Sequence, residues 1–367
     1  MSTPKPVVLC ILDGWGLRQD TTANAPALGH TPTFDRIMSE CPHATLVTHG
    51  RDVGLPTEQM GNSEVGHTNI GAGRIVAMDL GQIDLAIEDG SYGSMPALQN
   101  FITTLKSSGG TAHLMGVVSD GGVHAHIDHL IETANILDAA GIPIVVHAIT
   151  DGRDVAQKSA LKYFELLDQK LPKNAVIGTV IGRYFALDRD NRWDRVAQAY
   201  HAMANGTGPT AATPAEVITA AYADDKTDEF IPPSVIGDYA GMKDGDGIFM
   251  LNYRADRARE ILAALGDPAF DAFDVSGRPA LAAKLGMVDY STAHDDYMTT
   301  VFPKQKIKNT LGEWVAKQGL RNRRTELSFA SMGLASGCTA RSYTTPAFES
   351  TYWCSPTLIV PSRIDTR

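Results

Sequence analysis

Five arginines stand out as binding groups in a chain that is acidic overall. Arg153, Arg183, Arg189, Arg254 and Arg257 lie in or just after loops that follow predicted strands. Guanidinium groups bind carboxylate and phosphate through paired hydrogen bonds. A single arginine of this kind is most often a solvated surface residue. Five in comparable positions predict a pocket for an anion that bears phosphate, carboxylate or both.

Ser63 is a candidate nucleophile. It lies in Gly61-Asn62-Ser63-Glu64-Val65-Gly66-His67, just before a predicted helix start. Backbone N–H groups and the helix dipole favour negative charge there, which suits an oxygen that will carry phosphate. A base or a metal must first activate the hydroxyl. From these residues alone, a plain N-cap serine with Glu64 in the first turn is the better explanation.

Asp13 ends the first predicted strand, in Ile11-Leu12-Asp13-Gly14. A carboxylate at the end of a strand can bind a hard cation. An aspartate in a turn before glycine is nevertheless the commoner role of this dipeptide, and the dipeptide by itself favours the turn.

Three histidines follow a Gly-Gly turn within Ser119 to His129. We predict that His124 lies on the turn and faces the substrate. His126 and His129 are three residues apart, so we expect them on one face of a helix and partly solvated. A metal cluster of these histidines is the alternative.

Apolar runs that alternate with amphipathic helices must position these side chains. The predicted strands are 7–12, 112–118, 143–149, 175–181 and 247–252, and the predicted helices are 126–140, 156–169, 193–204, 214–222 and 255–264. This alternation predicts an α/β fold with mostly parallel sheets. Ligands of open α/β sheets bind at the carboxyl ends of strands, where the polar residues described above also lie.

Length and composition restrict the class of protein. A chain of 367 residues is long enough for two domains. A net charge of −10 gives no electrostatic attraction to nucleic acid or to anionic membranes, so we expect neither as a partner. The apolar run at 7–12 is far shorter than a membrane span. The four cysteines include no Cys-x-x-Cys pair, which favours buried or idle thiols in a reducing cytoplasm.

Seven segments form a recognisable series: Ile11–Gly16, Val53–His67, Ser119–His129, Asp151–Asp154, Gly182–Arg195, Asn252–Arg257 and Lys308–Glu313. In order and spacing they resemble the cofactor-independent (2,3-bisphosphoglycerate-independent) phosphoglycerate mutases over about the first 320 residues. The resemblance implies an α/β fold in which an inserted α/β transferase domain interrupts an alkaline-phosphatase-like domain, incomplete in this chain. The implied parts are 1–78 (phosphatase-like), 79–300 (inserted, substrate-binding), 301–320 (start of the return) and 321–367 (divergent tail).

The resemblance also implies a reaction. Members of this family interconvert 3-phosphoglycerate and 2-phosphoglycerate through a phosphoserine, which here would form on Ser63, and Asp154 would shuttle a hydroxyl proton. Two manganese ions assist in the family, and Asp13 and Ser63 are the metal ligands present in this chain. A monomer in the cytoplasm is expected. The implied substrate-binding residues are His124, Arg153, Asp154, Arg183, Arg189, Arg254 and Arg257.

The tail departs from the family pattern. Residues 321–367 contain seven serines and seven threonines, all eleven histidines occur by His294, and the last lysine is Lys317. In the family, one metal takes a further Asp and His, and the other takes an Asp and two His. Neither set is found here, nor is the family's substrate lysine, so at most one partial metal site is expected. We therefore predict a poorly packed tail beside an ordered 79–300 core.

Two alternatives follow from this departure. A catalytically dead remnant would bind phosphoglycerate weakly, whereas another phosphatase or a phosphopentomutase of the superfamily is disfavoured by the inserted-domain motifs. A reading-frame error after about Gly319 is a hypothesis for the tail. Translation of the gene in all three frames tests it, and the absence of a family-like continuation would refute it.

Overall fold

The computed structural model describes residues 7–55, 60–304, 306–321, 324–328, 339–343 and 357–362, the last three ranges by their backbone alone. The chain divides into two compact units, 1–81 with 306–367, and 82–305. The first boundary falls within α4 (Asp79–Glu88). The corresponding boundaries expected from the sequence are 78/79 and 300/301.

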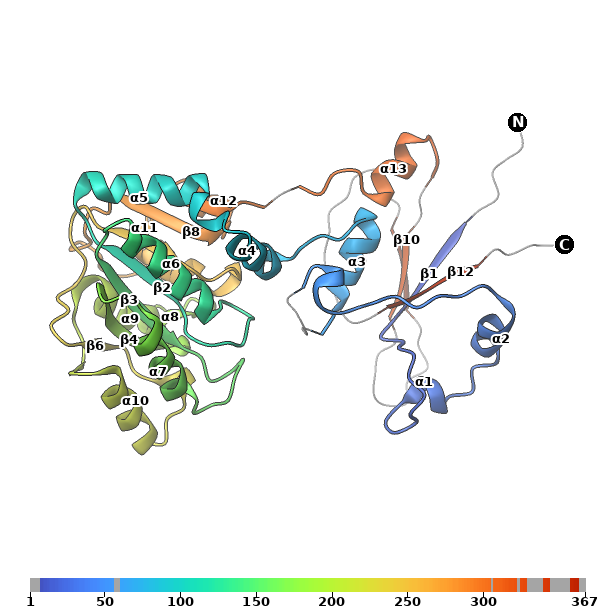
Figure 1. Ribbon diagram of the computed structural model, residues 1–367, viewed down its shortest axis with the longest axis horizontal. Coiled ribbons are helices and arrows are strands. Elements are labelled where there is room, and N and C mark those ends of the chain that lie inside the picture. Colours follow the sequence, from blue (N-terminus) through green and yellow to red (C-terminus); the bar gives the residue numbers. More distant parts are fainter. Residues whose placement is uncertain are drawn as a thin grey trace. The chain divides into compact units, whose positions relative to one another are not determined.

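The 82–305 unit is built on an eight-stranded sheet with the order β5-β6-β4-β3-β2-β7-β8-β9 (Figure 1). All neighbouring strands are parallel except β6 and β4. The strands are β2 (Ala112–Val117), β3 (Ile144–Thr150), β4 (Ala175–Gly182), β5 (Thr210–Ala211), β6 (Ser234–Ile236), β7 (Gly247–Met250), β8 (Ala283–Val288) and β9 (Thr299–Phe302).

The central strands form because their sequences are almost continuously apolar. Every residue of β2 and β3 is buried, as expected for parallel strands covered on both faces. The four strands predicted in this unit all form. The prediction missed β5 and β6, which are only two and three residues long, and β8 and β9. In β8, Lys284 and Gly286 interrupt the apolar run that would have indicated a strand.

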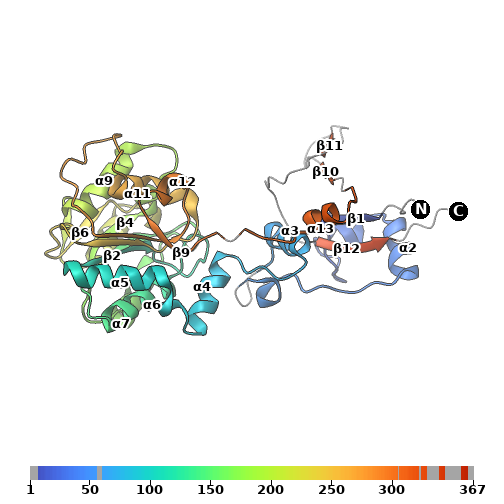
Figure 2. The ribbon, with the colours of Figure 1, turned by 90° about the horizontal axis from the view of Figure 1, so that it is seen from above.

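Helices cover both faces of this sheet. Figure 2 shows α5, α6 and α7 on one face and α9, α11 and α12 on the other. Local sequence sets their ends: Pro96 opens α5, and Gly109 closes it in a left-handed conformation (φ 69°). Besides residues 82–88 of α4, the helices of this unit are α5 (Pro96–Ser108), α6 (Ile127–Ala139), α7 (Ala160–Lys170), α8 (Arg183–Ala186), α9 (Trp193–Asn205), α10 (Pro214–Ala223), α11 (Arg259–Gly266) and α12 (Thr292–Asp295). Among the described residues, no helix has the length and apolar composition of a membrane span.

Two predicted helices begin later than expected, and in the first of them a tertiary contact holds the residues at the helix start. The helix predicted from 156 begins at Ala160, where Asp228 Oδ2 accepts the backbone N–H groups of Ser159 (2.8 Å) and Ala160 (2.9 Å). Asp228 therefore caps α7 from a 3₁₀ turn (Asp228–Phe230) that is distant in sequence. The helix predicted from 255 is a 3₁₀ turn over Ala255–Arg257, and α11 follows it.

The other unit contains two short antiparallel pairs. β1 (Val8–Asp13) pairs with β12 (Thr357–Ser362), and β10 (Arg324–Ser328) pairs with β11 (Thr339–Tyr343). The predicted poor packing of residues 321–367 concerns side chains that lie outside the described residues. The helices of this unit, besides the start of α4, are α1 (Ala25–Leu28), α2 (Pro32–Glu40), α3 (Ser63–Ala72) and α13 (Leu311–Lys317).

A chain of polar side chains crosses the core of the 82–305 unit. Asp246 Oδ2 lies 3.0 Å from His113 Nε2, His113 Nδ1 lies 3.0 Å from His147 Nε2, and His147 Nδ1 lies 2.9 Å from Thr179 Oγ1. Because the carboxylate only accepts, the chain is satisfied when both neutral imidazoles carry their proton on Nε2. Burial and the nearby His113 hold the pKa of His147 well below 6.5.

This network predicts that the 82–305 unit loses stability in mild acid. His147 stays neutral in the folded state while it gains a proton in the unfolded state, so stability is complete above about pH 6.5 and falls below it, by at most ~1.4 kcal/mol per pH unit for one histidine. Urea unfolding between pH 7 and 5 measures how steeply the free energy of unfolding changes with pH. We expect His147→Gln to reduce this slope and His201→Gln, at a half-buried position, to leave it unchanged. Equal slopes for wild type and His147→Gln would contradict the assignment.

Candidate active site

The strand order of the 82–305 unit creates one natural position for a ligand. From β2 the chain proceeds to β3 and β4 on one side, whereas β7, β8 and β9 follow on the other. Loops after β2 and β7 therefore diverge at this point, which is where open α/β sheets form a crevice at their carboxyl ends. The predicted binding residues of this unit follow four adjacent strands: His124 after β2, Arg153 and Asp154 after β3, Arg183 and Arg189 after β4, and Arg254 and Arg257 after β7.

A buried ion cluster joins three of these loops. The guanidinium of Arg183 is 2% exposed, and its Nη1 donates to Asp151 Oδ1 and Asp154 Oδ2, both at 2.6 Å. Asp151 also accepts a hydrogen bond from the hydroxyl of Ser119 at 2.6 Å. Burial would raise the pKa of Asp151, but these hydrogen bonds and the charge of Arg183 hold it below its usual value. Asp151 thus stays ionised and connects the ends of β2, β3 and β4.

His124 lies beside this cluster as a neutral imidazole. Its side chain is 4% exposed, and Nε2 lies 3.8 Å from Asp154 Oδ2. Burial, followed by the charge of Arg183, lowers its pKa to about 4. Its buried Nδ1 has no hydrogen-bond partner within the described part of the chain. A polar atom of this kind is available to a ligand, because a buried group without a partner is costly.

The remaining arginines come from the loops after β4 and β7. Asp256 Oδ2 accepts from Arg189 at 2.9 Å, and its Oδ1 lies 3.3 Å from Arg254 Nε. Burial would raise the pKa of Asp256, but Arg254 and Arg189 hold it below its usual range. Arg257 donates to the backbone carbonyl of Leu187 at 3.1 Å. Asp256 therefore links two of the predicted binding residues.

The positive charges of these arginines repel one another, as the pKa of Arg257 indicates. Burial lowers the pKa of Arg257, and the charges of Arg189, Arg183 and Arg153 lower it further. The guanidinium of Arg153 is half exposed and lies 3.6 Å from Glu229. Each guanidinium has five N–H donors, and the contacts above use only some of them. The site therefore offers several charge-assisted donors to one anion.

The other unit presents Ser63 with two polar neighbours. Ser63 is the first residue of α3, is 2% exposed, and donates its hydroxyl proton to Asp13 Oδ2 at 2.8 Å. Its oxygen also lies 3.1 Å from Nδ1 of His67, one turn along the helix. The N-cap is Asn62, whose side chain accepts the backbone N–H of Val65, so Ser63 is not the cap that the local pattern favoured. The Ser63 hydroxyl thus stands at a helix N-terminus, where backbone N–H groups and the dipole stabilise negative charge.

Asp13 and Ser63 provide only part of a metal site. Their oxygens are adjacent, and carboxylate and hydroxyl oxygens suit a hard cation. Among the described residues, however, no group of three His, Cys, Asp or Glu side chains is placed to hold a metal ion. The pair fits as two ligands of a larger coordination sphere.

Two expectations for the histidines after β2 are corrected. His126 is the N-cap of α6 and only His129 lies within that helix, because the Nδ1 of His126 accepts the backbone N–H of Asp128. His126 is partly exposed, as expected, but His129 is buried and its Nε2 lies 2.7 Å from Asp84 Oδ1. The pairing with a carboxylate from α4 explains why His129 can be buried. No histidine metal cluster forms within the described residues.

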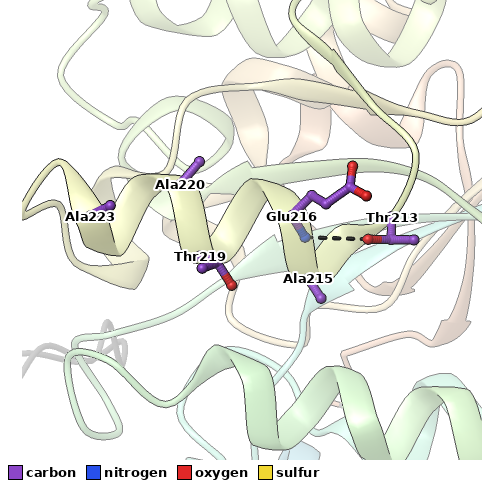
Figure 3. A pocket seen from close by; sticks show the side chains of 6 residues that line it. All are labelled: Thr213, Ala215, Glu216, Thr219, Ala220 and Ala223. Atoms are coloured by element: carbon purple, nitrogen blue, oxygen red, sulfur yellow. Dashed lines mark hydrogen bonds between the residues drawn. The ribbon is translucent and has the colours of Figure 1, made fainter.

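A shallow hollow on α10 is distinct from this site. Figure 3 shows its lining, which comes from α10 and its cap: Thr213, Ala215, Glu216, Thr219, Ala220 and Ala223. The marked hydrogen bond runs from the backbone N–H of Glu216 to Thr213 Oγ1 (3.3 Å) and caps the helix. The lining contains one carboxylate and no basic group, so an anion is not favoured there.

Sequence reasoning missed two acids that organise the arginine cluster and a histidine that contacts Ser63. Asp151, Asp256 and His67 lie within the segments that drew attention to Asp154, Arg254 and Ser63. Their position in those segments was the only available indication. The missing information was which acid lies next to which arginine, because the partners are far apart in sequence: Arg183 is 32 residues from Asp151, and Arg189 is 67 residues from Asp256.

Comparison with known proteins identifies the family. Residues 83–292, more than half of the chain, match the family described as BPG-independent PGAM N-terminus. The curated 2,3-bisphosphoglycerate-independent phosphoglycerate mutases of Dinoroseobacter shibae and Cereibacter sphaeroides are 67% and 65% identical to the chain over 321 residues, 88% of its length. The chain spans 64% and 63% of the length of these two relatives.

A solved structure extends the likeness to the fold. The crystal structure of Leishmania mexicana phosphoglycerate mutase at low cobalt concentration has a TM-score of 0.66 and 30% identity, covering 84% of this chain and 60% of that one. The expected fold class, an alkaline-phosphatase-like domain interrupted by an inserted α/β transferase domain, is confirmed by this neighbour. The chain belongs to the 2,3-bisphosphoglycerate-independent phosphoglycerate mutase family.

Proposed function

We propose that the chain binds a phosphoglycerate and takes part in the interconversion of 3-phosphoglycerate and 2-phosphoglycerate through a phosphoserine on Ser63. The arginine cluster in the loops after β3, β4 and β7 is the observation that carries the proposal, since a small molecule with both phosphate and carboxylate matches its donors. The names of the similar proteins support the same substrate. We further propose that 82–305 is the inserted substrate-binding domain and that 1–81 and 306–320 are phosphatase-like.

The binding groups have separate roles in this proposal. Arg153, Arg183, Arg189, Arg254 and Arg257 hold the carboxylate and phosphate oxygens. His124 is neutral at physiological pH, because its pKa is about 4, so its ring can both donate to and accept from the glycerate. Asp154 has its Oδ2 bound to Arg183 and is a candidate to carry a hydroxyl proton.

The reaction is two phosphoryl transfers through one nucleophile. In the first, an O–P bond forms at Ser63 Oγ and the bond between phosphorus and the substrate oxygen breaks. Asp13, which already accepts the hydrogen bond of the Ser63 hydroxyl, takes that proton. Asp154, a carboxylate paired with Arg183, takes the proton of the other glycerate hydroxyl and passes it to the released oxygen. In the second transfer, the deprotonated glycerate oxygen attacks the phosphoserine, and Asp13 returns the proton to Ser63. The net change is an isomerisation with no atom gained or lost.

A divalent metal is part of the proposal. The crystal structure of the Leishmania mexicana phosphoglycerate mutase is one at low cobalt concentration, and for this chain we propose Mn²⁺, with Asp13 and Ser63 among its ligands. When bound, such an ion lowers the pKa of a serine hydroxyl and neutralises phosphoryl oxygens. The monomeric state and the cytoplasmic location stay predictions.

Calorimetric titration with 3-phosphoglycerate tests the binding. We expect saturable binding to the chain and an affinity about ten- to a hundredfold lower for Arg257→Met, because a charge-assisted hydrogen bond contributes about 1.5–3 kcal/mol. Arg192→Met is the matched control, since Arg192 is half exposed and pairs only weakly with Asp194 at 3.4 Å. The absence of wild-type binding at millimolar ligand, or an equal loss in the control, would refute the proposed site.

A further inference from the structure

Two buried carboxyl groups lie beneath the loop that carries Arg189. Asp188 is 4% exposed and Glu260, on α11, is 8% exposed. Asp188 accepts the backbone N–H groups of Asp190 (2.8 Å) and Arg192 (3.0 Å) through Oδ1. Carboxylates are rarely buried unless they are paired, so this arrangement requires an explanation.

Glu260 completes the set of acceptors for this loop. Its Oε1 accepts the backbone N–H of Asn191 at 3.0 Å, and Asn191 adopts a left-handed conformation (φ 55°) that few residues other than glycine favour. Three consecutive N–H groups, at 190, 191 and 192, therefore end on the two buried carboxyls. The backbone next to Arg189 is held by this pair rather than by a helix or strand.

The charges around the pair do not balance if both groups are ionised. Among the described residues, one cation reaches it directly: Arg195 of α9, whose Nη1 lies 3.1 Å from Asp188 Oδ2 and whose guanidinium stacks on a tyrosine ring. Asp190 adds a like charge. The other basic side chains nearby, before α9, on α11, on α12 and in the turn before α11, have contacts elsewhere: Arg192 with Asp194, Arg259 with the Tyr290 carbonyl, His294 with the Arg259 carbonyl, and Arg257 with the Leu187 carbonyl.

One oxygen of Glu260 shows where a proton would reside. Glu260 Oε2 is fully buried and has no hydrogen-bond donor among the described residues. Asp188 is its neighbouring carboxyl. A proton on Oε2 turns that oxygen into a donor to Asp188 and removes one buried charge. In agreement, burial and then the repulsion from Asp188 raise the pKa of Glu260, whereas backbone hydrogen bonds and Arg195 hold the pKa of Asp188 low despite its burial.

We infer that Glu260 is a positioning residue for Arg189: in its protonated form it donates to Asp188 and closes the 188–192 loop so that Arg189 is held for the anion. This inference rests on the proposed function, in which Arg189 binds the phosphoglycerate. Loss of the proton places two carboxylates side by side in a buried site, and their repulsion loosens the loop. The contribution of Arg189 to binding is therefore present below the usual carboxyl range, near pH 4.5, and is lost as pH rises through the folded-state pKa of Glu260.

Glu260→Gln separates this effect from other titrations. A glutamine keeps the Oε1 acceptor for Asn191 and places a permanent N–H donor where the protonated Oε2 stands, so it reproduces the closed state at every pH. The phosphate of the ligand itself ionises near pH 6 and strengthens binding as pH rises in both proteins. Glu165→Gln, at an exposed position on α7, is the matched control.

The experiment combines carbon-13 NMR of the Glu260 carboxyl with calorimetric titration of 3-phosphoglycerate between pH 4 and 9. We expect Glu260 to titrate above 4.5, the Asn191 amide shift to follow it, and wild-type affinity to fall relative to Glu260→Gln by at most about tenfold per pH unit above that midpoint. Glu165→Gln should match the wild type.

The outcomes that overturn the inference are separate from those that overturn the proposed function. Three results would each refute the positioning role. Glu260 could titrate at or below 4.5, the Asn191 amide shift could stay constant through that titration, or wild type and Glu260→Gln could have identical pH profiles of affinity. If neither protein binds 3-phosphoglycerate, the proposed function fails, and the NMR titration still decides whether Glu260 holds the proton that controls the loop.

Discussion

Replacing Arg183 by methionine is expected to destabilise the 82–305 unit by about 3–5 kcal/mol, because it leaves the carboxylates of Asp151 and Asp154 without their shared cation. Asp151 is 2% exposed, so water cannot replace the guanidinium. The expected loss is a large fraction of the 5–15 kcal/mol that stabilises a typical domain. Urea denaturation at pH 7 measures it, and binding of 3-phosphoglycerate should be lost in the fraction that stays folded.

Two further variants show whether charge or volume causes the effect. In the double variant Arg183→Met with Asp151→Asn, one uncompensated charge is removed, so about 1–3 kcal/mol of stability should return. Arg153→Met should cost no more than about 1 kcal/mol, because Arg153 is half exposed and its contact with Glu229 is 3.6 Å long. A double variant no more stable than Arg183→Met alone would show that lost packing, rather than the buried charge, is responsible.

Ser63→Ala is expected to abolish phosphoryl transfer, by a factor on the order of 10⁴ or more, and to leave the affinity of the arginine cluster for 3-phosphoglycerate unchanged. The alanine retains the helix start but has no oxygen to accept the phosphoryl group. Turnover with Mn²⁺ present, measured by coupling the formation of 2-phosphoglycerate to its dehydration, and mass spectrometry of the Ser63 peptide after incubation with substrate provide two independent measurements.

The control for this prediction is Ser107→Ala, at an exposed position on α5 whose hydroxyl bonds only its own helix. It should match the wild type in both measurements. Phosphorylation at another residue of the Ser63→Ala variant, or undiminished turnover, would show that Ser63 is not the nucleophile. Binding without turnover in the wild-type chain would refute the proposed activity and leave the binding site intact.

The sequence determined the main elements of the 82–305 unit because its signals are local. Continuous apolar runs predicted β2, β3, β4 and β7, and their alternation with amphipathic helices predicted parallel strands between helical layers. Short or interrupted strands carried too little of this pattern, as β6 and β8 show. Helix starts were displaced where a distant group satisfied the backbone, as Asp228 does at Ala160.

The candidate site, like the fold, has features that the sequence predicted and features that it did not. Arginines after three strand ends could be predicted to meet, because parallel strands bring their carboxyl ends to one edge of a sheet. The sequence alone therefore determined the family, the fold class and the cationic character of the site. Only the tertiary structure decided that Asp151 and Asp256 link the arginines, that His124 is neutral, that His129 pairs with Asp84, and that Glu260 lies against Asp188. The physical reason is that burial and charge pairing join residues distant in sequence, and no local pattern encodes which two will meet.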